Sequence, residues 1–69
     1  MHFVLEVEQE VDGRWIAEIT DLPGVMSYGQ TLEEAMARTE ALALRVLAER
    51  LESGESRPMA VRIDLPLAA

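Results

Sequence analysis

Residues 21–35 read DLPGVMSYGQTLEEA, and this stretch decides the fold. Pro23 presets the backbone angle at the second position of a turn, and Gly24 accepts the positive φ that a type II turn requires. A short strand at Val25–Tyr28 follows, and Gly29 ends it. The stretch therefore predicts a sharp turn, a short strand and then the start of a helix.

One long helix is predicted from about Leu32 to Ser53, because capping signals stand at both of its ends. Thr31 matches an N-cap, Glu34 three residues later closes a capping box, and Gly54 matches a C′ residue. A stripe of residues at helical spacing is expected to face the core. Its members are Leu32, Ala35, Met36, Thr39, Leu42, Ala43, Val46 and Leu47.

The apolar arc of this helix is wider than one sheet face requires. Ala37, Leu44, Ala48 and Leu51 extend it, and charged side chains occupy the remaining arc. Two interpretations stay open: a deep packing angle within one molecule, or a contact between protomers along this shoulder. The second interpretation makes Leu44, Ala48 and Leu51 the candidate oligomer contacts.

Upstream of residue 21 the sequence predicts a β-hairpin. Apolar and polar residues alternate through Phe3–Glu10 and again through Arg14–Thr20, as in strands with one buried face. The apolar faces match only if Val7 lies opposite Ala17, because a shift of one residue moves a strand's whole apolar set to the wrong side. The connection is then a three-residue loop that ends in Gly13.

This register gives the hairpin two notable cross-strand pairs. Glu10 is placed opposite Arg14, which is favourable, and Glu6 opposite Glu18, which brings two like charges together. The repulsion between Glu6 and Glu18 suggests that the pair has another role.

A last strand is expected at Arg57–Leu65, before Pro66. The order β-β-β-α-β favours a right-handed crossover that returns the last strand parallel to the first. We therefore predict a single α+β domain over residues 1–69, with a four-stranded mixed sheet of order 3-2-1-4 and one helix on one face. The free face of the sheet is expected to carry Val4, Glu6, Glu8, Ile16, Glu18 and Arg62.

The composition limits the partners. The net charge is −7, from 13 acidic and 6 basic residues. This charge argues against binding to nucleic acid, which needs cationic side chains to displace counterions. It suits a basic protein partner or simply solubility. No apolar run approaches the ~18 residues of a membrane span, so we expect a cytoplasmic protein.

Few residues could carry out catalysis. The sequence contains no cysteine, and its one histidine, His2, stands next to the N-terminus, where a surface role is expected. The one enzymatic alternative is a metal-dependent nuclease or hydrolase using Glu6, Glu8 and Glu18, since carboxylates on adjacent strands can hold a divalent cation. Arg62 is expected to neutralise these acids instead. No cofactor is predicted.

Residues 15–35, WIAEITDLPGVMSYGQTLEEA, resemble the HicB-like antitoxin family. The family pattern is an aromatic and aliphatic strand, Asp-Leu-Pro-Gly, a small strand, Gly-[Asp/Gln]-Thr and then a Leu-Glu-Glu-Ala helix. The similarity covers about residues 3–53. It implies a partial ribonuclease-H-like fold. It also implies a non-catalytic antitoxin that binds and neutralises a small basic ribonuclease toxin of the HicA type. The sequence looks like a short family member without a C-terminal DNA-binding segment.

We therefore predict a non-enzymatic binding protein that forms a homo-oligomer, or alternatively a stand-alone HicB-like oligomer without a toxin. The expected partner contacts are Glu6, Glu8, Glu18, Arg62 and Tyr28. Trp15 is the other candidate aromatic anchor, but it shares the face of Ala17 and Ile19 and is expected in the core.

Overall fold

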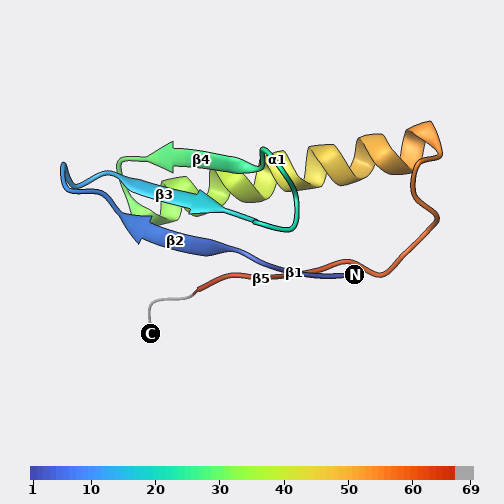
Figure 1. The fold of residues 1–69 in the computed structure, drawn as a ribbon, viewed down its shortest axis with the longest axis horizontal. Coiled ribbons are helices and arrows are strands. Elements are labelled where there is room, and N and C mark those ends of the chain that lie inside the picture. Colours follow the sequence, from blue (N-terminus) through green and yellow to red (C-terminus); the bar gives the residue numbers. More distant parts are fainter. Residues whose placement is uncertain (67–69) are drawn as a thin grey trace.

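The computed structural model describes residues 1–66. These residues form five strands and one helix, arranged as a thin layer of strands on a long helix (Figure 1). In chain order the elements are β1 (His2–Val4), β2 (Glu6–Gln9), β3 (Trp15–Glu18), β4 (Met26–Gly29), α1 (Leu32–Ser53) and β5 (Arg62–Asp64).

The predicted α+β class is confirmed, but the single four-stranded sheet of order 3-2-1-4 is wrong. The strands form a three-stranded antiparallel sheet, β2-β3-β4, and a separate two-stranded parallel sheet, β1-β5. The predicted first strand is divided at Leu5, whose backbone N–H donates to the carbonyl of Asp64 at 2.9 Å. Pro66 has no N–H to donate, so a parallel ladder between β5 and β2 cannot continue past it.

The last strand is also shorter than the predicted Arg57–Leu65. Only Arg62–Asp64 forms a strand, because β1 offers partners only from His2 to Val4. The orientation was predicted correctly, since β5 runs parallel to β1.

The hairpin register is confirmed. Val7 lies opposite Ala17 and Glu6 opposite Glu18. Gly13 closes the three-residue loop with a φ of 91°. Its N–H donates to the Glu10 carbonyl at 2.9 Å.

The turn at Pro23-Gly24 has the predicted type II form. Gly24 has a φ of 83°, and the Val25 N–H donates to the Leu22 carbonyl at 3.0 Å. Proline at the second position and glycine at the third are the residues that this turn type prefers. The strand that follows begins and ends one residue later than predicted, at Met26–Gly29.

The helix has the predicted bounds and caps. The Thr31 hydroxyl accepts from the N–H of Glu34 at 3.1 Å, and Gly54 ends the helix with a φ of 82°. The carboxylate of Glu34 accepts from the N–H of Gln30 at 3.0 Å. This reciprocal bond falls one residue before the N-cap, whereas a capping box places it on the N-cap itself.

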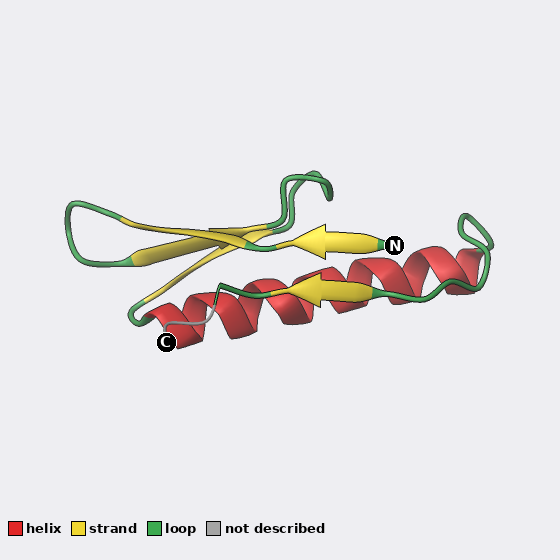
Figure 2. Cartoon of the chain, turned by 90° about the horizontal axis from the view of Figure 1, so that it is seen from below, coloured by secondary structure: helices red, strands yellow, loops and turns green. Residues whose placement is uncertain are grey.

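The core lies between α1 and the strands, and Figure 2 shows the three-stranded sheet on one side of the helix, whereas the last strand is drawn across the helix in this view. The helix presents small buried residues to the sheet, with Ala35, Thr39 and Ala43 each fully buried. The Thr39 hydroxyl donates to the carbonyl of Ala17 in β3 at 2.9 Å. Small residues on both sides let the helix backbone lie close to the strands, so this interface depends on close packing. The buried core residues are Phe3, Leu5, Ala17, Ile19, Leu22, Val25, Ala35, Ala43 and Leu47.

Candidate functional site

The face of the three-stranded sheet that points away from α1, here called the open face, carries two rows of side chains. One row crosses the sheet as Glu6–Glu18–Met26. The other row is Glu8–Ile16–Tyr28. The period-2 geometry of strands puts alternate residues on one face, so the same pleat that turns Ala17 toward the core places these six on the open face.

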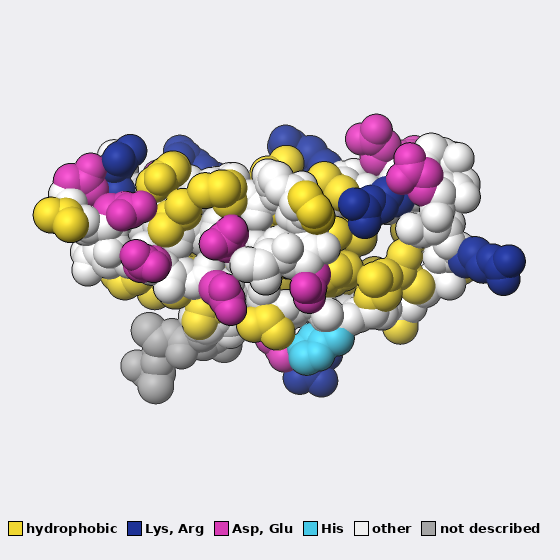
Figure 3. Space-filling view, in the orientation of Figure 1, with side chains coloured by type: hydrophobic (Ala, Val, Ile, Leu, Met, Phe, Trp, Pro, Cys, Tyr) yellow, Lys and Arg dark blue, Asp and Glu magenta, His cyan; other side chains and the backbone are white. Residues whose placement is uncertain are grey.

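Acidic and apolar groups are interleaved on the open face. Met26 and Tyr28 are each 41% exposed, and Ile16 between the strands is half-buried. Figure 3 looks onto this face and shows acidic and hydrophobic side chains mixed across its centre, with arginines nearer its margins. A shallow hollow between the rows is lined by Leu5, Glu6, Val7, Glu8, Ile16, Glu18 and Pro66.

The three glutamates on the open face, Glu6, Glu8 and Glu18, have no counterion in the described part of the chain. The ion pairs of residues 1–66 are formed by other side chains. Glu6 faces Glu18 directly across the strand pair, an arrangement that destabilises a sheet. Their negative charge is therefore available to an external cationic group.

Arg62 does not neutralise these acids, contrary to the expectation from the sequence. Its Nε donates to Asp64 Oδ1 at 2.8 Å, and His2 Nε2 lies 2.6 Å from Asp64 Oδ2. Arg62 is opposite His2 in the β1-β5 pair, two residues along the strands from the pair Val4–Asp64. Asp64, two residues along the same strand face, is closer to it than any glutamate of β2.

These contacts also act on Asp64 itself. The hydrogen bond from Arg62, followed by that from His2, lowers the pKa of the Asp64 carboxyl from its usual 3.8. A charged Asp64 is thus held by both neighbours at the junction of β1 and β5.

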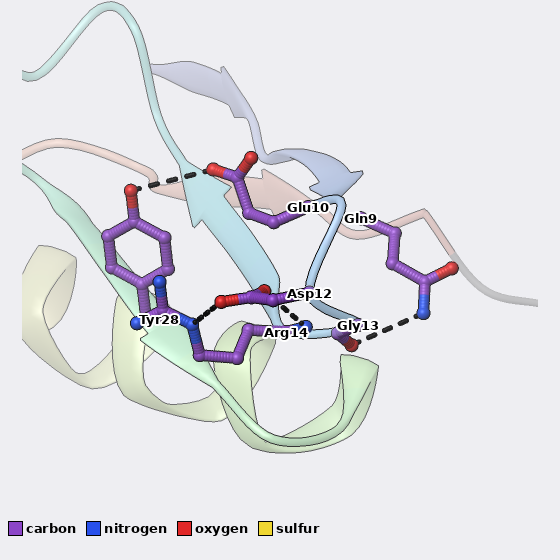
Figure 4. Close-up of polar contacts among 6 residues, drawn as sticks. All are labelled: Gln9, Glu10, Asp12, Gly13, Arg14 and Tyr28. Atoms are coloured by element: carbon purple, nitrogen blue, oxygen red, sulfur yellow. Dashed lines mark hydrogen bonds and ion pairs between the residues drawn. The ribbon is translucent and has the colours of Figure 1, made fainter.

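Tyr28 is supported at the hairpin end of the open face (Figure 4). The Arg14 guanidinium lies over its ring, 4.8 Å from the centroid, a distance suited to a cation–π contact. Asp12 holds Arg14 in turn, with 2.8 Å between Arg14 Nε and Asp12 Oδ2. The Tyr28 hydroxyl also reaches Glu10 Oε1 at 3.5 Å. This network presents the ring as an ordered apolar surface beside the acidic rows.

The Asp12–Arg14 pair also affects titration. The backbone N–H of Arg14 is the main cause that lowers the pKa of Asp12 from 3.8, and the Arg14 side chain adds to it. Gln9 Nε2 donates to the Gly13 carbonyl at 3.2 Å and steadies the same loop.

The open face offers no assembled metal site. Among residues 1–66, no three His, Cys, Asp or Glu side chains lie together in a geometry that could hold a metal ion. The sequence-based alternative, a metal-dependent hydrolase using Glu6, Glu8 and Glu18, therefore gains no support from their placement.

The remaining predicted residues lie elsewhere. Trp15 is half-buried and packs against the core, opposite Gly29. Leu44, Ala48 and Leu51 are exposed on α1. Met26 was missed, although alternation from the buried Val25 indicates that it points outward.

No helix in the described range is apolar over a length that would cross a membrane. No protein-family model matches the chain, and neither the curated proteins nor the solved structures include a match to it.

Proposed function

We propose that this chain is a non-catalytic, cytoplasmic binding protein of the HicB type. Its open face would capture and neutralise a small basic ribonuclease toxin of the HicA type. The observation that carries the proposal is the set Glu6, Glu8 and Glu18, which have no counterion among residues 1–66 and lie beside exposed Met26 and Tyr28.

Two properties of the open face suit a protein partner. Unpaired acids attract a basic surface over long range and speed the encounter. Exposed Tyr28 and Met26 offer the kind of aromatic and flexible apolar contact that is enriched at interface centres. A net charge of −7 adds to the attraction for a cationic protein.

The element order supports the same proposal. Taking β1 and β2 as two halves of one strand, the chain runs β-β-β-α-β, the order implied by the resemblance to HicB-like proteins. We propose on this ground that the fold is a partial ribonuclease-H-like fold in which the first strand is broken at Leu5.

The test begins with the tagged chain purified from its own cells and mass spectrometry of the proteins that accompany it. The small basic partner found in this way is then titrated with the purified chain by calorimetry. We expect the Glu6→Lys/Glu18→Lys variant to bind at least about tenfold more weakly, because each lost interfacial charge pair costs on the order of 1 kcal/mol or more.

A matched control makes the same charge change elsewhere. The Glu49→Lys/Glu55→Lys variant alters two exposed acids on the helix and the following loop. Equal weakening by both variants would indicate only nonspecific attraction. Full affinity in the Glu6→Lys/Glu18→Lys variant would exclude the open face, and absence of any basic partner would count against the antitoxin function.

A further inference from the structure

The side of α1 that faces away from the sheet carries an exposed apolar seam, defined here as Ala37, Ala41, Leu44, Ala48 and Leu51. All five residues are exposed, with Leu44 at 52% and Leu51 at 40%. The spacing between them alternates between four and three residues, as it does for the contact positions of a coiled coil. Ala41 was overlooked in the sequence, and it completes the pattern.

The seam is separate from the helix face that holds the core. At 3.6 residues per turn, its centre lies about 140° around the helix from the row Ala35, Thr39, Ala43 and Leu47. Those four residues are the buried ones of α1. Figure 2 shows the three-stranded sheet to one side of the helix, and all five seam residues are exposed in the part of the chain that the structure describes.

The molecule is less compact than is usual for a domain of its length. The radius of gyration is 12.7 Å, against about 11 Å for a compact domain of this length. The molecule measures 41 × 22 × 15 Å, long and thin. A small two-layer protein of this shape gains burial by pairing its outer helix face with another surface.

Strand addition at β4 is a poor alternative route to self-association. Arg38 Nη1 donates to the carbonyl of Tyr28 at 2.9 Å. Tyr28 lies in the edge strand of the three-stranded sheet. A charged side chain on an edge carbonyl blocks the approach of another strand. The helix seam is therefore the surface better suited to a second copy.

Charged residues on the two flanks of the seam match a parallel pair of helices. Glu33 and Glu40 lie on one flank, and Arg38 and Arg45 lie on the other. In a parallel coiled coil, a residue on the first flank of one helix contacts a residue on the second flank of the partner helix. The contacted residue stands five positions later in the sequence. Glu40 then meets the partner's Arg45. Arg38 is already held within the molecule, by the Tyr28 carbonyl at 2.9 Å and by Glu34 at 3.3 Å.

Antiparallel pairing gives a poorer match, because it brings Arg45 of both copies together near the middle of the seam. In the described chain, Glu40 and Arg45 make no ion pair of their own, so both are free for this contact.

We propose that a second copy of this chain packs against the seam with the two α1 helices parallel. The seam spans about 21 Å at 1.5 Å per residue. A shallow groove lined by Leu32, Met36, Ala37 and Leu65, among others, continues it sideways. The groove would add surface beside the seam, and stable dimers typically bury roughly 800 Å² per partner.

The pairing is independent of the proposed function. It leaves both open faces pointing outward, so a dimer would present two acidic faces to its surroundings.

Sedimentation of the purified full chain at about 100 μM tests the pairing, and we expect the mass of a dimer. The Leu44→Glu/Leu51→Glu variant should sediment as a monomer with an unchanged helical circular dichroism spectrum. The control is Val11→Glu, which changes a fully exposed apolar residue at the hairpin tip and should remain dimeric. A monomeric parent chain would overturn the proposal, whatever the variants do.

Orientation is tested with an introduced cysteine, because the chain has none of its own. In a parallel pair, position 51 of one copy faces the same position of the other, so the Leu51→Cys variant should form a disulfide-linked dimer under mild oxidation. An antiparallel pair places this residue near the partner's Ala41, so failure of Leu51→Cys to crosslink would overturn the parallel arrangement.

Charge reversal gives a second readout that does not depend on oxidation. Glu40→Arg and Arg45→Glu should each weaken the dimer by about tenfold, since each replaces two symmetric ion pairs by repulsion. The combined variant should recover most of that loss, because the reversed charges meet again across the interface. No recovery in the combined variant would contradict the proposed pairing of Glu40 with the partner's Arg45.

Discussion

The two faces of the strands differ in how much their side chains contribute to stability. On the packed face, Phe3, Leu5 and Ala17 are each no more than 2% exposed. On the open face, Met26 and Tyr28 are each 41% exposed, and Glu6 stands opposite Glu18. The packed face therefore supplies stability through close contact with α1, whereas the open face keeps a charge repulsion that lowers stability. We expect mutations on the two faces to have effects of different size and opposite sign.

The largest effect is expected at Gly29 on the packed face. A Cβ there would lie 2.5 Å from the Ala35 nitrogen and 2.9 Å from its Cα. Backbone atoms at a helix start cannot move aside cheaply, so Gly29→Ala should destabilise the protein by roughly 3 kcal/mol, measured by urea unfolding.

The control for this prediction is Gly13→Ala, which also adds one methyl group. Gly13 has a φ of 91° but no atom within 4 Å of a Cβ built there. Its cost should be about 1 kcal/mol from backbone conformation alone. Similar losses in both variants would show that the packed face is looser than the distances indicate.

A smaller loss is expected from Thr39→Val. The substitution keeps the shape of a fully buried side chain but removes the hydroxyl that donates to the Ala17 carbonyl at 2.9 Å. Loss of such a bond in a buried site costs about 1–2 kcal/mol. Thr39→Ser keeps the hydroxyl, so comparing the two variants by thermal unfolding separates the hydrogen bond from the methyl group. A Thr39→Val variant as stable as the parent chain would refute the assigned role.

On the open face the sign should reverse. Glu18→Gln removes the like-charge contact with Glu6 and should raise stability by about 0.2–0.5 kcal/mol at low salt. The gain should shrink as salt screens the repulsion. The control is Glu49→Gln on the helix, which changes the net charge by the same amount. An equal gain in stability from Glu49→Gln would mean that the net charge alone causes the gain.

The smallest effect concerns the loss of stability at acid pH. The pKa of Asp64 is lowered from 3.8 in the folded state, first by Arg62 and then by His2. A folded pKa below the unfolded one contributes stability that is present above pH 3.8 and is lost as the pH falls through the lowered folded value. Asp64→Asn should therefore flatten the fall in stability between about pH 5 and pH 2.

The measurement for Asp64→Asn is chemical denaturation at each pH in that window. Because the Asp64 side chain is 41% exposed, the change should be small. An unaltered acid profile would mean that the β1-β5 junction contributes nothing to acid sensitivity.

Local sequence signals were sufficient for most of the fold. Pro23-Gly24 specified the turn, and Thr31 and Gly54 specified the ends of α1, because each of these residues acts on backbone groups within four positions of it. The alternation of β2 and β3 was enough to set their register, since slipping by one residue would expose Val7 and Ala17.

The acidic part of the candidate site followed from the same register, which placed Glu6 opposite Glu18. Met26 and the true partner of Arg62 were missed. The sequence contained a signal for each of them. Met26 follows the buried Val25 and must point to the opposite face, and Asp64 lies two residues from Arg62 on the same strand face. The contact between His2 and Asp64, which lie 62 positions apart in the sequence, carried no local signal.

By itself, the sequence determined the order of the elements, the turn types, the caps of α1, the hairpin register and the excess of negative charge. These depend on side chains acting on their own neighbourhood or on a repeat of two or 3.6 residues. Only the tertiary structure decided that the first strand is divided at Leu5 between two sheets, that β5 is limited to Arg62–Asp64, and that the open-face acids find no counterion within the described part of the chain. These features depend on backbone hydrogen bonds and charges from residues about sixty positions apart, whose pairing no local pattern encodes.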